Sequence, residues 1–269
     1  MSIGQAGDAP KENGWQPIFL QMANEYVIKS TDNPPRQFEL KKSPILRWSQ
    51  PVRGGDDGAT FVWMDRGRPA VIGTIFAYPN ADQTRTVVHE FHSLARGPLS
   101  GTWRTKVNWQ PKTEGVELHE IADAPAPADK AAIRLTQMRE IMREFSARSI
   151  DTKDQPWELR LMPQPVVRYE TDERDDVLDG AIFAFAQGTD PEILFVLEAT
   201  RSPKGWRYGC GRFSDYRLEL KRKNEVVWQV GRSNFGDLTG TYFATDALVR
   251  TAPPGAKVLK DREATDANK

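Results

Sequence analysis

Residues 57–61 read Asp-Gly-Ala-Thr-Phe and residues 179–183 read Asp-Gly-Ala-Ile-Phe, so one stretch occurs twice, 122 residues apart. The same offset aligns the residues that follow each copy: Pro69 with Pro191, Ala77 with Ala199, Arg85 with Arg207, and Phe91 with Phe213. No gap is needed across this stretch. Repetition at a fixed spacing is how internal repeats appear in a sequence, and here it predicts two copies of one large unit.

A helix is predicted upstream of each copy, over residues 15–29 and 130–149. Each of these segments carries apolar residues at the 3.6-residue period of a buried helix face. The apolar stripes align at an offset of 119: Phe19 with Met138, Met22 with Ile141, Ala23 with Met142, and Tyr26 with Phe145. Strands are predicted after the first helix at residues 37–49, 60–65, 70–78, 85–95, 99–109 and 116–121. After the second helix they are predicted at residues 157–169, 181–187, 192–200, 206–213, 216–221 and 226–230.

Short Gly/Pro-containing loops, such as residues 187–191, separate the predicted strands. Loops this short join antiparallel neighbours. We therefore expect an α+β fold, an internal duplication of a unit made of one helix followed by an antiparallel β-meander, with a pseudo-twofold axis. The expected divisions are a disordered N-terminus (1–13), a first unit (14–121), a Pro/Ala linker (122–129), a second unit (130–232) and an extended, mostly disordered tail (233–269).

Composition excludes some classes of partner. The chain has 37 basic and 37 acidic residues, so it lacks the overall field that draws proteins to nucleic acid. No apolar run is long enough to span a bilayer. Residues 1–13 contain no apolar core of a signal peptide. The protein is therefore expected to be cytoplasmic, or periplasmic or secreted if a leader was removed.

The single cysteine, Cys210, excludes an intrachain disulfide. Arg207 and Arg212 lie close to it in sequence and could activate the thiol as a nucleophile. Free cysteine is, however, among the most often buried residue types. We interpret Cys210 as a buried strand residue.

All three histidines fall in the first unit, where a catalytic site would have to use His89, Glu90, His92 or His119. The zinc pattern HExxH places its histidines four residues apart on a helix, whereas residues 89–92 are expected to form a strand. On a strand His89 would point inward, and Glu90 and His92 would share the opposite, more exposed face. We expect neither a metal site nor a cofactor.

Two arginine pairs occur in both units: Arg47 with Arg168, and Arg85 with Arg207. A buried charge needs a partner, and Glu39 and Glu158 are available in the two units. Internal ion pairs are the first interpretation. The second is that the four arginines bind an anionic ligand clamped between the units, since the guanidinium group suits bidentate contacts with a carboxylate.

Asp57 and Asp179, which open the repeated stretches, also allow two interpretations. Two symmetry-related carboxyl groups could share a proton at the axis between the units. Alternatively, each Asp-Gly pair is a turn, in which Asp bonds its own backbone and Gly adopts a positive φ. We favour the turn.

Residues 179–198 (DGAIFAFAQGTDPEILFVLE) and 158–165 (ELRLMPQP) resemble segments of uncharacterised proteins from planctomycete-type bacteria. The resemblance is partial and concerns the second half of the chain. It implies a bacterial source, and such proteins often carry an export signal. It implies no activity, ligand or catalytic residue, because that family has no assigned function.

The expected function is that of a non-enzymatic bacterial binding or interaction protein, with any ligand held between the two units. Helix-backed curved sheets often enclose a cavity with a few polar groups. The partner would be a small anionic ligand or another protein. The alternative is a hydrolase-like or metal-dependent enzyme that uses the histidines. An enzyme would concentrate its chemistry in the first unit, whereas symmetric binding would use arginines from both.

Overall fold

The computed structural model describes residues 14–50, 56–82, 84–171 and 175–250. Both helices are shorter than the sequence predicts: α1 spans Gln16–Asn24 and α2 spans Ala131–Met142. Each is followed at once by a strand, β1 (Val27–Ser30) or β10 (Phe145–Ile150). After each helix the apolar pattern changes from the helical period to alternation. From Phe145 onward alternate residues of β10 are buried, as in a strand with one covered face.

Three antiparallel sheets contain all the strands of the described residues. One sheet has the order β1-β7-β8, and a second has the order β18-β6-β5-β4-β2, with β3 beside β4. The nine-stranded third sheet has the order β17-β16-β10-β11-β13-β14-β15-β9, with β12 beside β13. The strands of the first half are β2 (Glu39–Leu40), β3 (Leu46–Gln50), β4 (Asp56–Asp65), β5 (Arg68–Pro79), β6 (Arg85–Ser93), β7 (Leu99–Trp103), β8 (Val107–Trp109) and β9 (His119–Glu120). The second half adds β11 (Pro156–Leu161), β12 (Val167–Tyr169), β13 (Val177–Gln187), β14 (Asp190–Arg201), β15 (Lys204–Arg212), β16 (Arg217–Arg222), β17 (Glu225–Val230) and β18 (Tyr242–Arg250).

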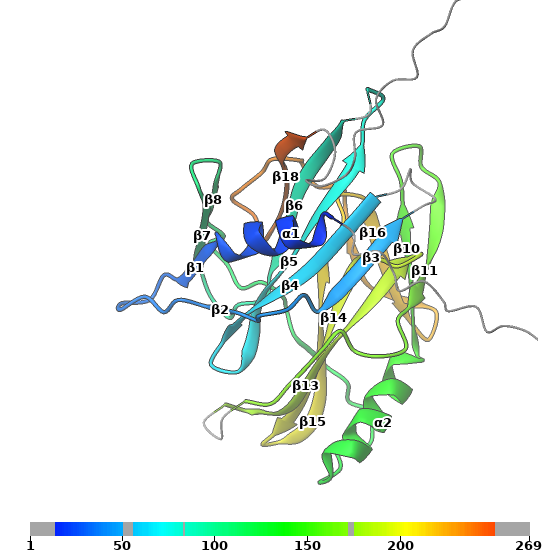
Figure 1. Cartoon of the computed structure of the whole chain (residues 1–269). Coiled ribbons are helices and arrows are strands. Elements are labelled where there is room, and N and C mark those ends of the chain that lie inside the picture. The colour runs from blue at the N-terminus through cyan, green and yellow to red at the C-terminus, as the bar shows by residue number, and fades with distance from the viewer. Residues whose placement is uncertain (1–13, 51–55, 83, 172–174, 251–269) are drawn as a thin grey trace, which may run out of the picture.

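The predicted α+β duplication of a helix-plus-meander unit is wrong. The described chain is mostly β, with two helices and large, curled antiparallel sheets (Figure 1). Its strands do not follow a meander, since the chain leaves β15 and returns to the far edge of the sheet, where β16 pairs with β10. Alternation of apolar residues identifies a strand, but it does not say which distant strand becomes its neighbour.

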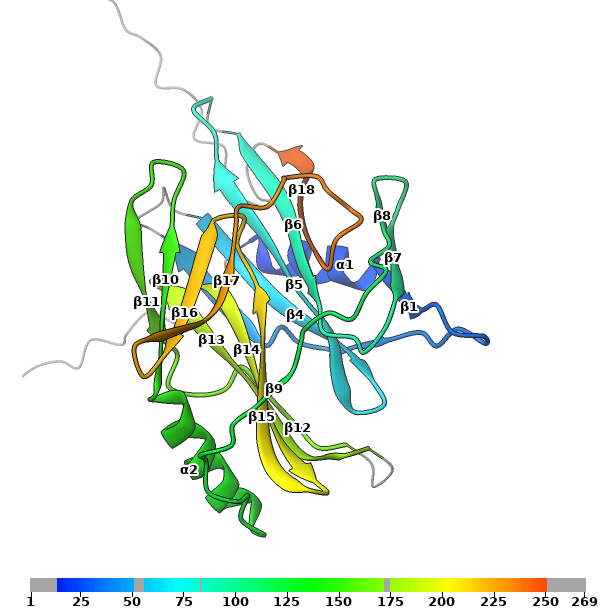
Figure 2. The same ribbon diagram turned by 180° about the vertical axis from the view of Figure 1, so that it is seen from behind.

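The two halves of the chain exchange strands (Figure 2). β9 follows the first half in sequence but pairs with β15 in the nine-stranded sheet. β18 follows the second half but pairs with β6 in the six-stranded sheet, from Tyr242 to Arg250. β18 lies in the segment 233–269 that was predicted to be an extended, mostly disordered tail, whereas residues 1–13 and 251–269 lie outside the described residues.

Individual cross-strand pairs recur between the halves. Trp48 lies opposite Gly58, and Tyr169 lies opposite Gly180. In each case the aromatic ring occupies the space of a side chain, because a Cβ added to the glycine would lie 2.3 Å from Trp48 or 2.2 Å from Tyr169. Glycine is therefore required at both positions for steric reasons.

The gapless alignment of the two halves holds as far as β5 and β14 but is wrong beyond them. Pro79 pairs with Arg85 across the loop 80–84, whereas Arg201 pairs with Lys204 across the shorter loop 202–203. The difference in loop length shifts the register. By strand pairing, Lys204 corresponds to Arg85, and Arg207 does not.

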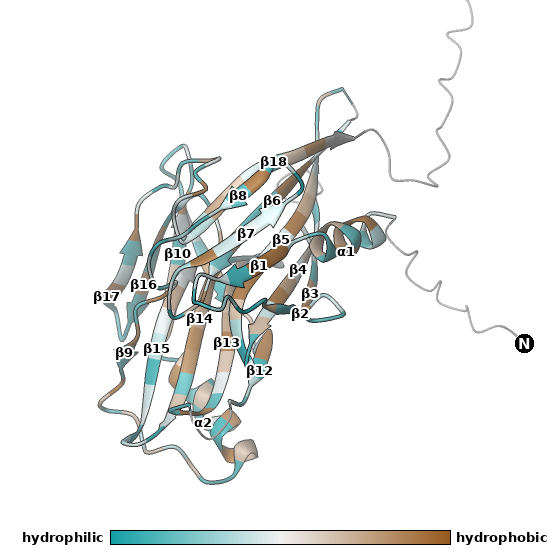
Figure 3. Cartoon of the chain, turned by 90° about the vertical axis from the view of Figure 1, so that its left-hand side faces the viewer, coloured by the Kyte–Doolittle hydropathy of each residue, from teal (hydrophilic) through white to brown (hydrophobic). Residues whose placement is uncertain are grey.

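Apolar residues fill the space between the halves as well as the space under each helix. Figure 1 shows α1 lying across β4 and β5, and Phe19 of α1 is fully buried there. A separate cluster joins the halves and includes Val62, Ile72, Ile182 and Val196. Strand β14 is apolar along most of its length (Figure 3) because both of its faces are covered. No helix among the described residues is long and apolar enough to cross a membrane.

Candidate functional site

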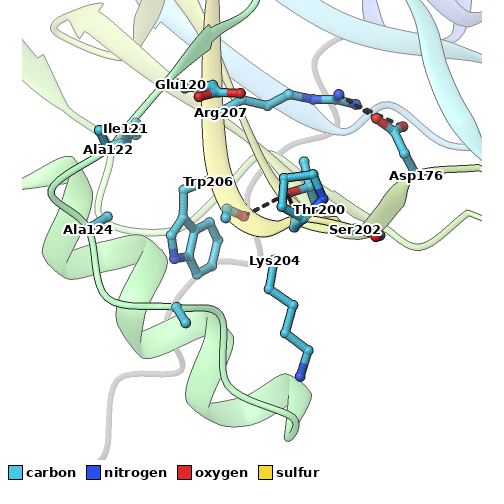
Figure 4. Close-up of a pocket in the computed structure, with 13 residues that line it drawn as sticks. Glu120, Ile121, Ala122, Ala124, Asp176, Thr200, Ser202, Lys204, Trp206 and Arg207 are labelled. Carbon is cyan, nitrogen blue, oxygen red and sulfur yellow. Dashed lines mark hydrogen bonds and ion pairs between the residues drawn. The ribbon is translucent and has the colours of Figure 1, made fainter.

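A cavity of about 340 Å³ lies where the chain leaves the edge of β15 (Figure 4). We call it the hairpin pocket, because the β14–β15 hairpin forms one wall and the segment 120–126 forms the other. Its lining residues are Glu120, Ile121, Ala122, Ala124, Ala126, Asp176, Thr200, Ser202, Pro203, Lys204, Gly205, Trp206 and Arg207. The volume lies at the lower end of the range typical of small-molecule sites.

The pocket exists because the strand pairing beside β15 stops early. β9 pairs with β15 only at Glu120 and His119, and the backbone N–H of Ile121 then donates to Trp206 O at 2.8 Å. The following segment contains Pro125 and Pro127, which have no N–H for a sheet ladder. The chain therefore turns away from the sheet edge and leaves the space that becomes the pocket.

One wall of the pocket is apolar and rigid. Trp206 is only 2% exposed, and its indole Nε1 donates to Pro125 O at 2.8 Å. The wall opposite, formed by the segment 120–126, is also apolar and includes Ile121, Ala122, Ala124 and Ala126. A buried indole with its N–H satisfied is a fixed surface on which the apolar part of a ligand can pack.

Two of the charged lining residues are fully engaged in the fold. Arg207 donates from Nε to Glu198 at 2.9 Å and from its terminal nitrogens to both carboxylate oxygens of Asp176. Burial would lower the pKa of Arg207, but the two carboxylates outweigh that effect and raise it. The same guanidinium holds the pKa of Asp176 well below its usual range. Arg207 and Asp176 therefore shape the pocket more than they offer groups to a ligand.

The other two charged residues are available. Lys204 Nζ lies 2.9 Å from Asp129, but their side chains are 54% and 90% exposed, and such surface pairs contribute little to stability. The exposed carboxylate of Glu120 makes no hydrogen bond or ion pair with the described part of the chain. Figure 4 shows Glu120 at one end of the pocket and Lys204 at the other, with Trp206 between them.

His89 packs among the aromatic side chains of the first-half core and does not line the hairpin pocket. Its Nδ1 lies 2.7 Å from the Tyr26 hydroxyl, and its ring meets Trp103 edge-on at 4.5 Å between centroids. Burial lowers the pKa of His89 to about 3. It therefore stays neutral, as an inward-facing core residue, which agrees with the predicted direction of its side chain.

Glu90 and His92 share the opposite face of β6, as predicted, but they are buried and not exposed. The reason is that this face of β6 packs against the second half, where a Cβ at Gly211 would contact His92. The Tyr242 hydroxyl donates to Glu90 Oε1 at 2.5 Å. Burial raises the pKa of Glu90 to about 8 and lowers the pKa of His92 to about 4.

The fold does not bring the four predicted catalytic candidates together. His119 is exposed on β9, with its ring 5.5 Å from that of Tyr208, whereas His89 and His92 point to opposite faces of β6. Within the described ranges, no group of three or more His, Cys, Asp or Glu side chains is arranged to hold a metal ion. Cys210 is buried in the second-half core, as predicted, and burial raises the pKa of its thiol.

The four predicted ligand-binding arginines do not converge either. Arg168 binds Asp179 at 2.6 Å and Arg207 binds Asp176 and Glu198, whereas Arg85 Nη1 lies 3.8 Å from Asp57. No hydrogen bond or ion pair joins Arg47 to another described residue. Internal ion pairs are therefore the observed role of Arg85, Arg168 and Arg207, but the predicted partners Glu39 and Glu158 are wrong.

Asp179 is neither a turn residue nor one of a pair of carboxyl groups that share a proton. It lies inside β13, fully buried, and accepts hydrogen bonds from Arg168 and from Arg134 of α2, the latter at 2.8 Å. This ion cluster anchors α2 to the sheet. Its counterpart Asp57 lies inside β4.

The sequence reasoning missed a buried charged cluster between the halves. Arg68 of β5 donates from Nε to Glu198 of β14 at 2.9 Å, and the Tyr169 hydroxyl donates to the same carboxylate at 2.6 Å. Arg68 also donates to Leu94 O at 2.7 Å. The available signal was the lone carboxylate of Glu198 in an otherwise apolar run, since a buried charge requires a partner.

The chain matches no protein-family model, no curated protein and no solved structure. The geometry of the hairpin pocket and of the residues around it is therefore what points to a function.

Proposed function

We propose that this protein is a non-enzymatic binding protein, and that the hairpin pocket holds a small ligand with opposite charges at its two ends. The observation that carries the proposal is the pairing of an apolar wall, formed by Trp206, with available charges at both ends. Sites for small molecules typically combine an apolar lining with a few placed polar groups. The proposal moves the ligand away from the space between the halves, which side chains fill.

The spacing of the charges limits the length of the ligand. Glu120 lies opposite Arg207 in the strand pairing, three residues along β15 from Lys204. At a rise of about 3.3 Å per residue, the two positions are about 10 Å apart along the strand. Glu120 shares its face of the sheet with its cross-strand partner Arg207, whereas Lys204 and Trp206 project from the other face, so the ligand must pass the sheet edge where β9 ends. A molecule with an ammonium group for Glu120, a carboxylate for Lys204 and an apolar middle against Trp206 meets this requirement when it crosses that edge. A dipeptide with an apolar side chain has these features.

A bacterial envelope is the compartment that we propose, and it is supported only by the resemblance of residues 158–165 and 179–198 to planctomycete-type proteins. The enzymatic alternative gains no support from the site. None of the histidines lines the hairpin pocket, and of its two carboxylates that of Asp176 is bound by Arg207.

The test is isothermal titration calorimetry with a panel of apolar dipeptides and their N-acetylated and C-amidated forms. Glu120→Gln is expected to weaken binding of the free dipeptide about tenfold, the loss of one charge-assisted contact. The same variant should leave binding of the N-acetylated form unchanged, because that form has no ammonium group. If no member of the panel binds, the proposal is wrong.

A pocket-filling variant tests the location. A Cβ at Gly205 would meet only Thr200 Oγ1, at an ordinary contact distance of 3.6 Å, and Gly205 lines the pocket, so Gly205→Leu is expected to fill it. Gly97→Leu is the matched control, because a Cβ there has no neighbour within 4 Å. We expect Gly205→Leu to abolish binding and Gly97→Leu to preserve it. Equal binding by both variants would place the ligand elsewhere.

A further inference from the structure

A second cavity, of about 350 Å³, lies at the C-terminal end of α2. The helix forms one side, and the end of β11 with the chain that follows it forms the other. We call it the helix-end cavity. Its lining residues are Arg139, Met142, Arg143, Leu161, Met162, Pro163, Gln164 and Phe183, none of which lines the hairpin pocket.

The floor of the helix-end cavity is apolar. Met142 and Phe183 belong to the core of the second half and are 0% and 1% exposed. Leu161 and Met162 are half-buried at its side. Methionine side chains are flexible and polarisable, and surfaces rich in them adapt to apolar ligands of different shape. The cavity can therefore receive an alkyl chain or a ring.

The charges at the cavity have one sign. Arg139 and Arg143 line it, and no acidic side chain does. Arg139 donates from Nη2 to Gln164, but its Nε is buried and has no hydrogen-bond partner. Arg143 is exposed and makes no ion pair with any described residue. This differs from Arg168 and Arg207, whose guanidinium groups are bound to carboxylates.

A structural role accounts for part of this arrangement but not for all of it. Basic residues in the last turn of a helix interact favourably with the negative end of the helix dipole. That effect does not explain why two guanidinium groups line one cavity that has no carboxylate among its lining residues. It also does not explain the cavity. In the 119-residue alignment of the two helices, Leu20 of α1 stands at the position of Arg139, and Leu20 packs against the apolar core.

We infer that the helix-end cavity binds a monomeric anionic amphiphile, a carboxylate attached to an apolar chain. The carboxylate accepts hydrogen bonds from the guanidinium groups of Arg139 and Arg143. The apolar chain packs on Met142, Met162 and Phe183. Guanidinium groups bind carboxylates in a bidentate manner, so two of them define the position of the head group.

The probes are the straight-chain carboxylates from octanoate to dodecanoate, below their critical micelle concentrations, and the alcohols of the same lengths. Affinity, measured by isothermal titration calorimetry, is expected to rise about fourfold per added CH₂ while the chain remains inside the cavity. The double variant Arg139→Gln/Arg143→Gln should bind the carboxylates at least tenfold more weakly. Its affinity for the alcohols should be unchanged, since they carry no charge.

Two control variants make the result specific. Arg217→Gln removes an exposed positive charge elsewhere in the second half and should leave carboxylate affinity unchanged. Gly205→Leu fills the hairpin pocket and should also have no effect, which separates this inference from the proposed function. Equal carboxylate affinity in the double variant and the unsubstituted protein overturns the inference. So does binding that is seen only with anionic lipid vesicles and not with the monomeric acids.

Discussion

Arg68 Nε lies 2.9 Å from Glu198 Oε1, and this ion pair joins β5 of the first half to β14 of the second. Their side chains are 9% and 0% exposed. Burial would raise the pKa of Glu198, but Arg68, Tyr169 and Arg207 together hold it below its ordinary value. Between the halves the molecule therefore has a charged cluster surrounded by apolar side chains. The sequence analysis predicted a bound ligand at this place.

Arg68→Met is expected to destabilise the protein by about 3–5 kcal/mol, because it leaves the Glu198 carboxylate buried with fewer partners. The change should appear as a lower midpoint of urea unfolding. The control is Arg96→Gln, which breaks an ion pair with Asp175 whose arginine is 43% exposed and should cost about 1 kcal/mol or less. Similar losses for the two variants would show that the buried cluster is not a special source of stability.

Gly58→Ala and Gly180→Ala are each expected to destabilise the protein by about 1–3 kcal/mol, the usual cost of overpacking a filled site. The new methyl group would meet the ring of Trp48 or Tyr169. Combining Gly58→Ala with Trp48→Ala should cost less than the sum of the two separate changes. Chemical denaturation of the four proteins measures this, and strict additivity would contradict the contact.

Glu90 makes stability depend on pH between about 5 and 8. Burial is the main cause of its raised pKa, the charges of Glu192 and Asp215 add to it, and the Tyr242 hydroxyl and Arg212 oppose it. In the unfolded chain Glu90 loses its proton near its ordinary pKa of 4.5, whereas in the fold it keeps the proton up to about pH 8. The free energy of unfolding should therefore fall as pH rises through this window, by up to about 5 kcal/mol.

Glu90→Gln is the matched variant, because its amide oxygen can still accept the Tyr242 hydrogen bond without ionising. It should be more stable than the unsubstituted protein at pH 9 and nearly equal to it at pH 5. Urea unfolding at the two pH values measures the difference. A variant that is no more stable at pH 9 would show that Glu90 ionises freely in the fold.

His89 makes the free energy of unfolding rise with pH, over a lower pH range than that of Glu90. Burial depresses its pKa from 6.5 to about 3, so below pH 6.5 the unfolded chain binds a proton that the fold does not. Its contribution to stability is complete above pH 6.5 and should be lost progressively as pH falls toward 3. A titration by nuclear magnetic resonance should find no protonation of His89 between pH 7 and 5. A midpoint near 6.5 would contradict its burial.

Much of the strand content could be predicted from the sequence because alternation is a local signal. The predicted strand at 192–200 corresponds to β14, and that at 226–230 corresponds to β17. Pairings between distant segments carry no such signal. The pairing of β16 with β10, and of β18 with β6, joins segments far apart in the chain and could not be read from periodicity.

The candidate sites show the same limit. The sequence indicated which face of β6 carries Glu90 and His92, but not that the second half covers that face. The hairpin pocket depends on where the chain leaves the edge of β15, which is decided by the pairing of His119 and Glu120. Its lining residues Glu120, Lys204 and Trp206 belong to no recognisable sequence motif. Among the lining residues, only Arg207 was predicted from the sequence to bind a ligand.

The most direct test of the account follows the indole N–H resonance of Trp206 in ¹⁵N-labelled protein as an apolar dipeptide is added. This group donates to Pro125 O in the wall of the hairpin pocket, and Trp206→Phe identifies its signal among those of the eight tryptophans. The account predicts that the Trp206 signal shifts in a saturable manner, together with the amide of Gly205. Saturable shifts elsewhere in the protein, with the Trp206 signal unchanged, would contradict it.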